Sequence, residues 1–188
     1  MEKTIIMTGI GGQGVKLAGE LLCYAACKAE GLNAANYALY GREKRGGMSD
    51  CYVTISDAQI TAPVFAQADY VIAFTTETPV SPAEKIREDS VLFLNTGREV
   101  SAETYHAKNF VVFDADRMAE KVKNPKGANM IILGVLVGYT EILPEELVLR
   151  MIFEKLGARH PEFNELNEKA YRYGLEYGKT LAARRKSK

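Results

Sequence analysis

This sequence of 188 residues is poor in cysteine. Its three cysteines, Cys23, Cys27 and Cys51, are an odd number and include no C-x-x-C pair. This pattern argues against a disulfide framework and favours a reducing cytoplasm. An iron–sulfur cluster normally takes four cysteine thiolates, so the chain cannot hold such a cluster alone. Cys23 and Cys27 lie four residues apart on one helix face, where apolar packing is expected instead of metal binding.

The sequence also lacks an excess of charge of either sign and a long hydrophobic run. Lysine plus arginine and aspartate plus glutamate both number 24, so the net charge is zero. This balance argues against non-specific nucleic-acid binding, which relies on a strong positive field. The longest apolar run, Met130–Tyr139, is too short to span a bilayer, and no N-terminal signal pattern is seen. We therefore predict one cytoplasmic domain over residues 1–188, with neither membrane nor nucleic acid as a partner.

Residues for catalysis are scarce as well. There is no G-x-S-x-G motif and no paired-carboxylate arrangement, and His106 and His160 have no neighbours at metal-ligand spacing. Asp114 and Asp116 fit a turn with a helix N-cap better than a metal site. We therefore predict no catalytic and no metal-binding residue in this chain. Such an inventory suits a subunit that shapes or closes an active site carried largely by other chains.

A glycine-rich turn, Gly9–Gly14, is the most distinctive stretch. Gly9, Gly11 and Gly14 fit the spacing G-x-G-x-x-G between an apolar run and a segment with helical periodicity. Glycine permits φ > 0 and a close approach to the backbone. A helix N-terminus offers free N–H groups and a partial positive charge, which suits a phosphate or carboxylate. A tight turn that binds nothing is the alternative interpretation.

A free-standing dinucleotide-dependent reductase is one function that this turn allows. That fold usually places an acidic residue at the end of the second strand to bind the ribose. Here the second strand, Asn33–Tyr40, ends without an acid, although Arg42 or Arg45 could meet a 2′-phosphate. The P-loop spacing G-x-x-x-x-G-K-[ST] is absent. The reductase therefore stays an alternative.

The segment Gly41–Asp50 is a second glycine-rich loop, with three glycines and three cations in ten residues. Arginine offers planar, forked donors and glycine frees backbone N–H groups, so such a loop could wrap an anion. A solvated loop with turn glycines is the alternative.

The order of elements predicts an α/β fold: a three-layer α/β/α arrangement with a mostly parallel, Rossmann-like sheet and a helical C-terminal part. Gly134 and Gly138 would let a core helix or a partner subunit approach closely. Strands are expected at residues 3–8, 33–40, 51–56, 70–74, 91–95 and 110–113, and helices at residues 14–30, 84–88, 130–139, 144–156 and 161–186.

Three linked motifs resemble the gamma subunit of the 2-oxoacid:ferredoxin oxidoreductases, which includes the gamma-like part of pyruvate, 2-oxoglutarate and indolepyruvate enzymes. They are Gly9–Val15, Tyr40–Gly47 and Cys51–Ser56, matching a G-x-G-G-Q-G turn, a Y-G-x-x-x-R-G-G loop and an alternating strand that ends in serine. The resemblance covers essentially the whole chain and is strongest over residues 5–56.

The resemblance implies a role in oxidative decarboxylation of a 2-oxoacid to acyl-CoA and CO₂, with electrons passed to ferredoxin. It places thiamine diphosphate, Mg²⁺ and iron–sulfur clusters in partner subunits, and it implies alpha and beta chains, with or without a delta chain, as partners. The 2-oxoacid is not identified. Because a subunit separated from its partners exposes their docking surface, the isolated chain is also expected to self-associate.

The two loops follow the first two strands, so they should lie together at the carboxyl edge of the sheet. We expect an anionic ligand there, with coenzyme A as the candidate, bound by backbone N–H groups, Gln13 and an arginine. Docking onto sister subunits without a ligand is the alternative, as is a scaffold whose loops bind no cofactor. The predicted site residues are Gly9, Gly11, Gly12, Gln13, Gly14, Tyr40, Gly41, Arg42, Arg45, Gly46 and Gly47.

Overall fold

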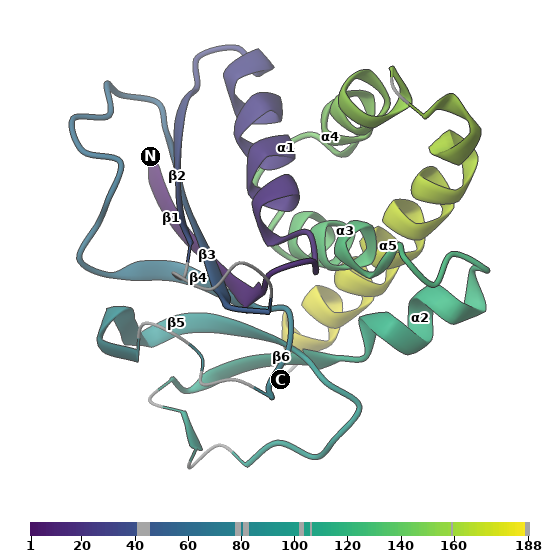
Figure 1. The fold of residues 1–188 in the computed structure, drawn as a ribbon. Helices are drawn as coiled ribbons and strands as arrows, with labels where there is room; N and C mark the ends of the chain where they lie inside the picture. The colour runs from purple at the N-terminus through teal and green to yellow at the C-terminus, as the bar shows by residue number, and fades with distance from the viewer. Residues whose placement is uncertain are drawn as a thin grey trace. The chain divides into compact units, whose positions relative to one another are not determined.

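The computed structural model describes residues 1–40, 46–77, 80, 83–101, 104–105, 107–158 and 160–186. The chain divides into two compact units, Met1–Phe113 and Asp114–Lys188, which are described separately (Figure 1). The first unit contains β1 (Glu2–Ile10), α1 (Val15–Lys28), β2 (Asn33–Tyr40), β3 (Met48–Ser56), β4 (Ala68–Ala73), β5 (Ile86–Asn95) and β6 (Asn109–Phe113). The second contains α2 (Ala115–Lys121), α3 (Ala128–Thr140), α4 (Glu145–Ile152) and α5 (Asn164–Lys186).

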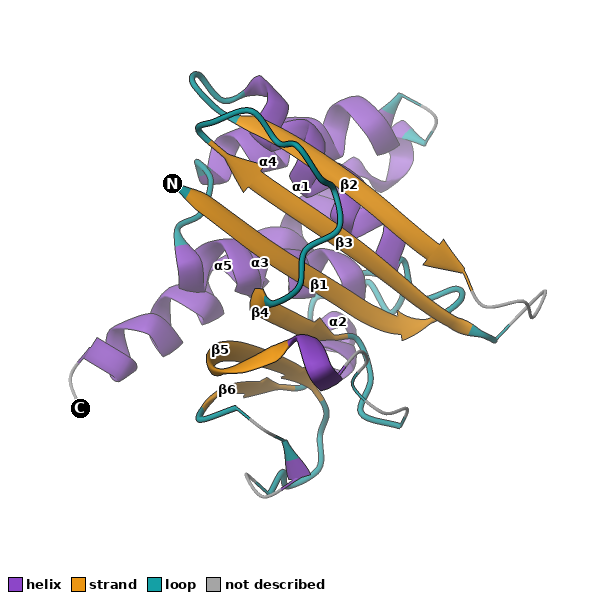
Figure 2. Cartoon of the chain, turned by 90° about the vertical axis from the view of Figure 1, so that its left-hand side faces the viewer, coloured by secondary structure: helices purple, strands orange, loops and turns teal. Residues whose placement is uncertain are grey.

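The six strands form one sheet in the order β2-β3-β1-β4-β5-β6 (Figure 2). The pairs β1/β4, β4/β5 and β5/β6 are parallel, whereas β3 is antiparallel to both of its neighbours. The prediction of a mostly parallel α/β sheet is therefore confirmed, with β3 as the reversed strand. Residues 41–47 connect β2 to β3, and this connection is too short for the crossover that a parallel neighbour would need. As a result β3 runs antiparallel to β2, and because it also pairs with β1 it lies between these two strands.

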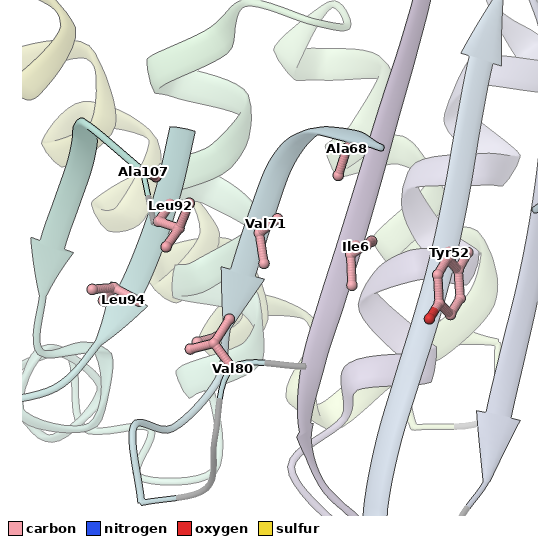
Figure 3. Close-up of a cluster of buried hydrophobic side chains, with 9 residues drawn as sticks. Ile6, Tyr52, Ala68, Val71, Val80, Leu92, Leu94 and Ala107 are labelled. Atoms are coloured by element: carbon pink, nitrogen blue, oxygen red, sulfur yellow. The ribbon is translucent and has the colours of Figure 1, made fainter. Parts of the chain in front are cut away.

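One face of the sheet in the first unit carries a cluster of buried apolar side chains, shown in Figure 3. Its members alternate along each strand, as Val71 and Ala73 do in β4 and Leu92 and Leu94 in β5, because side chains two residues apart share a face. The residues between them are buried as well. Burial on both faces explains why these strands read as near-continuous apolar runs.

Helix α1 packs against β2 and β3, and Gly19 permits its closest approach. A Cβ at Gly19 would lie only 2.3 Å from Cys51 Sγ, so a larger residue would displace the helix. Burial, with Glu20 nearby, raises the pKa of Cys51 to about 12, and burial beside Cys27 does the same for Cys23. Both thiols are protonated at neutral pH, as apolar packing requires. Cys27 is exposed, so the expectation that it packs in the core is wrong.

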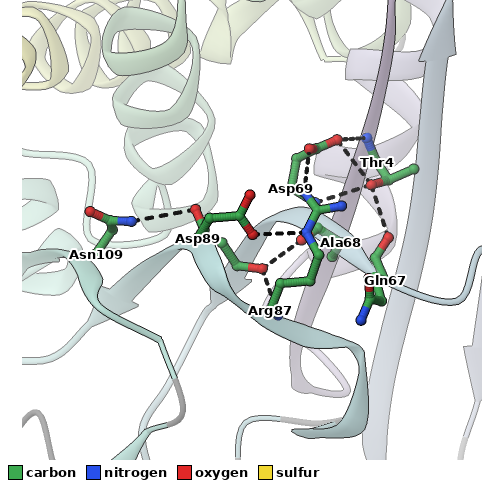
Figure 4. A network of polar contacts seen from close by, with 8 residues as sticks. Thr4, Gln67, Ala68, Asp69, Arg87, Asp89 and Asn109 are labelled. Carbon is green, nitrogen blue, oxygen red and sulfur yellow. Dashed lines mark hydrogen bonds and ion pairs between the residues drawn. The ribbon is translucent and has the colours of Figure 1, made fainter.

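A polar network joins the starts of β1, β4 and β5 (Figure 4). Asp69 Oδ2 accepts from the Thr4 N–H at 2.8 Å and Oδ1 accepts from Arg87 Nη2 at 2.7 Å. Burial alone would raise the pKa of Asp69, but these bonds outweigh it and lower the pKa. Ser90 Oγ extends the network to the Ala68 carbonyl at 2.6 Å. The network therefore links the starts of β1, β4 and β5, which are far apart in the sequence.

In the second unit, α3 and α5 pack backbone against backbone. A Cβ at Gly134 would lie 2.2 Å from Tyr171 O, and one at Gly138 would lie 2.1 Å from Leu175 O. Gly174 of α5 is equally close to Ile131 O, at 2.2 Å. Of the two neighbours that the sequence allowed for these glycines, the one found is a helix of the same chain.

Three of the predicted helices differ most from the structure. The helix predicted at Glu84–Glu88 is wrong: a 3-10 turn covers Ala83–Lys85 and β5 begins at Ile86, where pairing with Ala68 draws the segment into the sheet. Helix α4 ends at Ile152 and continues as a π-helical turn, Phe153–Gly157. A 3-10 turn at Pro161–Phe163 precedes α5, which begins at Asn164.

Candidate functional site

The two glycine-rich loops meet at one edge of the sheet. The turn 11–14 follows β1, and the second loop returns to β3 through Gly46 and Gly47. The Gly11 N–H donates to Gly47 O at 2.9 Å, directly beyond the last β1–β3 pair, Ile10 with Met48. The structure therefore brings the first loop and the end of the second into contact, as their positions after β1 and β2 predicted.

Positive φ angles shape both loops. Gly12, Gly14 and Gly46 have φ of 105°, 80° and 76°, a region that residues with a Cβ rarely adopt. A Cβ placed on Gly12 or Gly46 would meet no atom of the residues that the structure describes within 4 Å. Gly9 differs, because a Cβ there would lie 2.6 Å from Gln13 Oε1 and 2.9 Å from Phe74 Cβ.

Gln13 stabilises the first turn through two hydrogen bonds to Ile10. Its Oε1 accepts from the Ile10 N–H at 2.8 Å, and its own N–H donates to Ile10 O at 3.1 Å. The Gly11 N–H is occupied by Gly47, so it is not free to face an anion in this state. Within the described part of the chain, the N–H groups of Gly12 and Gly14 have no hydrogen-bond partner. These two donors stand at the N-terminus of α1, where an anion would also meet the positive end of the helix dipole.

Asp50 lies beside the loops and was not singled out from the sequence. It pairs across the strands with Thr8, whose Oγ1 donates to Asp50 Oδ1 at 2.6 Å. Burial raises the pKa of this carboxyl above its usual range, and the Thr8 hydrogen bond offsets part of that rise. The signal that could have found it is its charge, since Asp50 is the one charged residue in Met48–Ser56.

Three predicted site residues, Gly41, Arg42 and Arg45, lie outside the described residues. Tyr40 ends β2 and pairs with Ser49 through its backbone. The described part of the site therefore consists of the turn 9–14, the backbone of Tyr40, Gly46 and Gly47, with Asp50 added by the structure.

The described residues contain no group of three or more histidine, cysteine or acidic side chains arranged to hold a metal ion. None of the helices in the described ranges combines the length and hydrophobicity that a bilayer crossing requires.

Comparisons with known proteins agree on one family. The chain matches the family described as pyruvate ferredoxin/flavodoxin oxidoreductase over residues 4–177. The 2-oxoglutarate synthase subunit KorC of Methanocaldococcus jannaschii is 30% identical over 184 residues, which is 96% of each chain. The pyruvate synthase subunit PorC of Thermotoga maritima is 31% identical over 174 residues, 89% of this chain and 90% of that one.

A solved structure gives the same result. The gamma subunit of the keto/oxoacid ferredoxin oxidoreductase of Geobacter sulfurreducens superposes with a TM-score of 0.80 at 27% identity, over 96% of this chain and 98% of that one. These comparisons give no support to a free-standing dinucleotide-dependent reductase. The chain therefore belongs to the pyruvate ferredoxin/flavodoxin oxidoreductase family, as a gamma-type subunit of a 2-oxoacid:ferredoxin oxidoreductase.

Proposed function

We propose that this subunit works with alpha and beta chains, with or without a small delta chain, to convert a 2-oxoacid and coenzyme A into acyl-CoA and CO₂. Two electrons leave for ferredoxin through the complex. An iron–sulfur cluster normally takes four cysteine thiolates, and this chain has three cysteines. Thiamine diphosphate, Mg²⁺ and the clusters are accordingly assigned to the partner subunits.

Within that complex, we assign the binding of coenzyme A to the two glycine-rich loops. The observation that carries this assignment is the hydrogen bond from Gly11 to Gly47, which holds the loops together at the sheet edge. A Cβ placed on Gly12 or Gly46 would meet no described atom within 4 Å, which leaves room for a ligand. The Gly12 and Gly14 N–H groups would supply donors for a phosphate. Arg42 and Arg45 follow β2 in the sequence and would supply positive charge.

The chain's own contribution to the reaction would then be positional. The Gln13 bonds to Ile10 fix the shape of the turn before a ligand arrives, so little conformational entropy is lost on binding. Donors at the start of α1 would orient the phosphates and leave the thiol end of coenzyme A free to reach the partner subunits. The chemistry on the 2-oxoacid is supplied by thiamine diphosphate and the clusters when they are bound.

The edge strand β2 supports a second role, docking of a partner subunit. Tyr37 is 43% exposed and Leu39 is 41% exposed, and the strand carries no charged residue. An uncharged edge strand with free backbone groups readily pairs with another chain. In the isolated chain the same edge is available to a second copy, which is the expected route to self-association.

The test of the coenzyme A assignment is Arg45→Ala in the assembled complex. We expect the Michaelis constant for coenzyme A to rise about tenfold while the subunits still co-purify, because one charge-assisted contact to a phosphate is lost. The matched control is Arg98→Ala, an exposed arginine outside both loops whose side chain is 80% exposed.

Two results would contradict the assignment. A complex that fails to assemble, with coenzyme A affinity unchanged in the fraction that does form, would make the loops docking elements. An equal rise in the Michaelis constant for coenzyme A in Arg98→Ala would show that any lost positive charge has this effect, not a specific contact of Arg45. Assays of the wild-type complex with 2-oxoglutarate, pyruvate, and branched-chain and aryl 2-oxoacids would identify the substrate.

A further inference from the structure

A cavity of about 400 Å³ lies within the second unit, away from both glycine-rich loops in the sequence. It is formed by the connection between α2 and α3, the π-helical turn after α4, and the start of α5. Its apolar wall consists of Pro125, Leu156, Phe163 and Leu166. This volume falls in the range of sites that hold small molecules.

Two amide side chains line this cavity. Asn124 is only 9% exposed, and Asn167 is partly exposed. Because both amides line the cavity, their N–H groups can donate to the oxygen atoms of a ligand bound there.

The charged side chains in the described lining of the cavity are lysines. Lys123 and Lys126 both line the cavity, neither forms an ion pair with a described residue, and no carboxylate is present among the described lining residues. His160, also in the lining, is bonded to Glu162 through Nδ1 at 3.2 Å. A neighbouring groove differs, since its Glu165 and Glu168 neutralise Lys169 and Arg172. The cavity is therefore suited to an anion and the groove is not.

The backbone around the cavity is also unusual. Lys123 has φ of 59°, a left-handed conformation that is uncommon for a residue with a Cβ. Leu156 belongs to the π-helical turn Phe153–Gly157, and such turns occur frequently at functional sites. Phe163 is 48% exposed, and the centroids of the His160 and Phe163 rings are 5.9 Å apart. Both irregularities place residues in the same cavity wall.

We propose that this cavity is a binding site for a small organic carboxylate with an apolar body. The carboxylate would accept hydrogen bonds from the Asn124 and Asn167 amides, and Lys123 and Lys126 would supply the charge. The apolar body would lie against Leu156 and Phe163. A monoanion fits this wall better than a phosphate, which is usually held by arginine forks or clustered backbone N–H groups.

The probe is 3-phenylpropanoate, which has a carboxylate and an aromatic body but no 2-oxo group, and so is not a substrate for 2-oxoacid decarboxylation. Calorimetric titration of the assembled complex and of the free full-length chain is expected to show one site per chain. We expect 3-phenylpropan-1-ol, which lacks the charge, to bind about tenfold more weakly or worse. Inorganic phosphate, which lacks the apolar body, is expected to bind at least as weakly as the alcohol.

Two variants localise the site. Asn167→Ala and Lys126→Gln alter partly or fully exposed side chains, so folding should be retained, and each is expected to weaken binding about tenfold. Lys121→Gln is the matched control, because Lys121 lines the neighbouring groove but not the cavity. It should leave the affinity unchanged.

The proposal is overturned if 3-phenylpropanoate fails to bind at about 10 mM, or if it binds both variants as tightly as wild type. It is also overturned if phosphate binds equally well, or if the free chain binds the probe and the assembled complex does not. The last result would make the cavity a docking pocket for a partner subunit. None of these outcomes changes the coenzyme A test with Arg45→Ala, so the two proposals fail independently.

Discussion

Glycines serve opposite purposes at the α3–α5 contact and at the glycine-rich loops of this chain. At the α3–α5 contact, a Cβ on Gly134, Gly138, Gly174 or Gly178 would strike backbone atoms at 2.1–2.4 Å. At the glycine-rich loops, a Cβ on Gly12 or Gly46 would meet no atom within 4 Å in the described part of the chain. The first set is required because the space is filled by the same chain. The second set leaves space at a positive φ, which is what a ligand or partner requires.

The largest expected effect is at the filled glycines. Gly138→Val would force the side chain against the Leu175 carbonyl, which lies 2.1 Å from the position of the Cβ. Because both sides of this contact are backbone, neither can move without separating the helices. We expect a loss of about 3 kcal/mol or more of unfolding free energy, measured by urea denaturation. A loss below about 1 kcal/mol would show that α3 and α5 can slide apart, and would contradict the conclusion that Gly138 is required for their contact.

Gly9→Ala tests the boundary between the two kinds of glycine. Its Cβ would contact side-chain atoms of Gln13, Phe74 and Val15 at 2.6–2.9 Å, and some of these can shift. We expect a loss of about 1–2 kcal/mol in thermal or urea unfolding. The matched variant is Gly11→Ala, whose Cβ would meet Gly47 O at an ordinary 3.5 Å. It should change stability by less than about 0.5 kcal/mol, and an equal loss in both variants would contradict the geometry.

The same comparison extends to two acids bonded to β1. Asp69 bonds to Thr4 at the start of the strand and Asp50 bonds to Thr8 near its end, beside the open loops. Arg87 faces Asp69, and the pKa of Asp69 is lowered; burial raises the pKa of Asp50. At the start of β1, the charge of Asp69 is therefore neutralised by Arg87. Near the end of β1, beside the loops, Asp50 is a carboxyl that is costly to ionise.

Asp69→Asn should destabilise the chain by about 1 kcal/mol at pH 7, because the charge-assisted bond with Arg87 is lost. A carboxyl whose folded pKa is lowered contributes stability above its unfolded pKa, and that contribution disappears as the pH falls through the folded pKa. The difference between wild type and variant should therefore vanish in acid. Urea denaturation at several pH values checks this, and a difference independent of pH would contradict it.

Asp50→Asn should change the free energy of unfolding least among these variants, and in the direction opposite to Asp69→Asn. A carboxyl whose folded pKa is raised favours the folded state at low pH, and this advantage is lost as the pH rises from its unfolded pKa through the folded one. Asparagine can still accept the Thr8 hydrogen bond. We expect the variant to equal or slightly exceed wild type at pH 7 in urea denaturation. A clear loss at pH 7 would mean that the Asp50 charge is stabilised in the folded chain.

Much of the fold could be predicted from the sequence, because hydrophobic periodicity is local. The apolar runs within β1, β4, β5 and β6 and the strongly apolar α3 were recognisable from their own residues. The segment 84–88 was not, since its strand character comes from pairing with Ala68. The prediction failed where a partner in the sheet, and not the segment itself, decided the structure.

The sequence by itself determined the family, the strand–turn–helix at Gly9–Gly14 and the glycines that require special backbone geometry, since spacing and residue type are properties of the chain. Only the tertiary structure decided that β3 lies between β1 and β2, that Gly11 bonds to Gly47, and that Asp50 stands beside the loops. It also decided that Asn124 and Asn167 share one cavity. Each of these depends on contacts between residues far apart in the sequence, and periodicity carries no information about them.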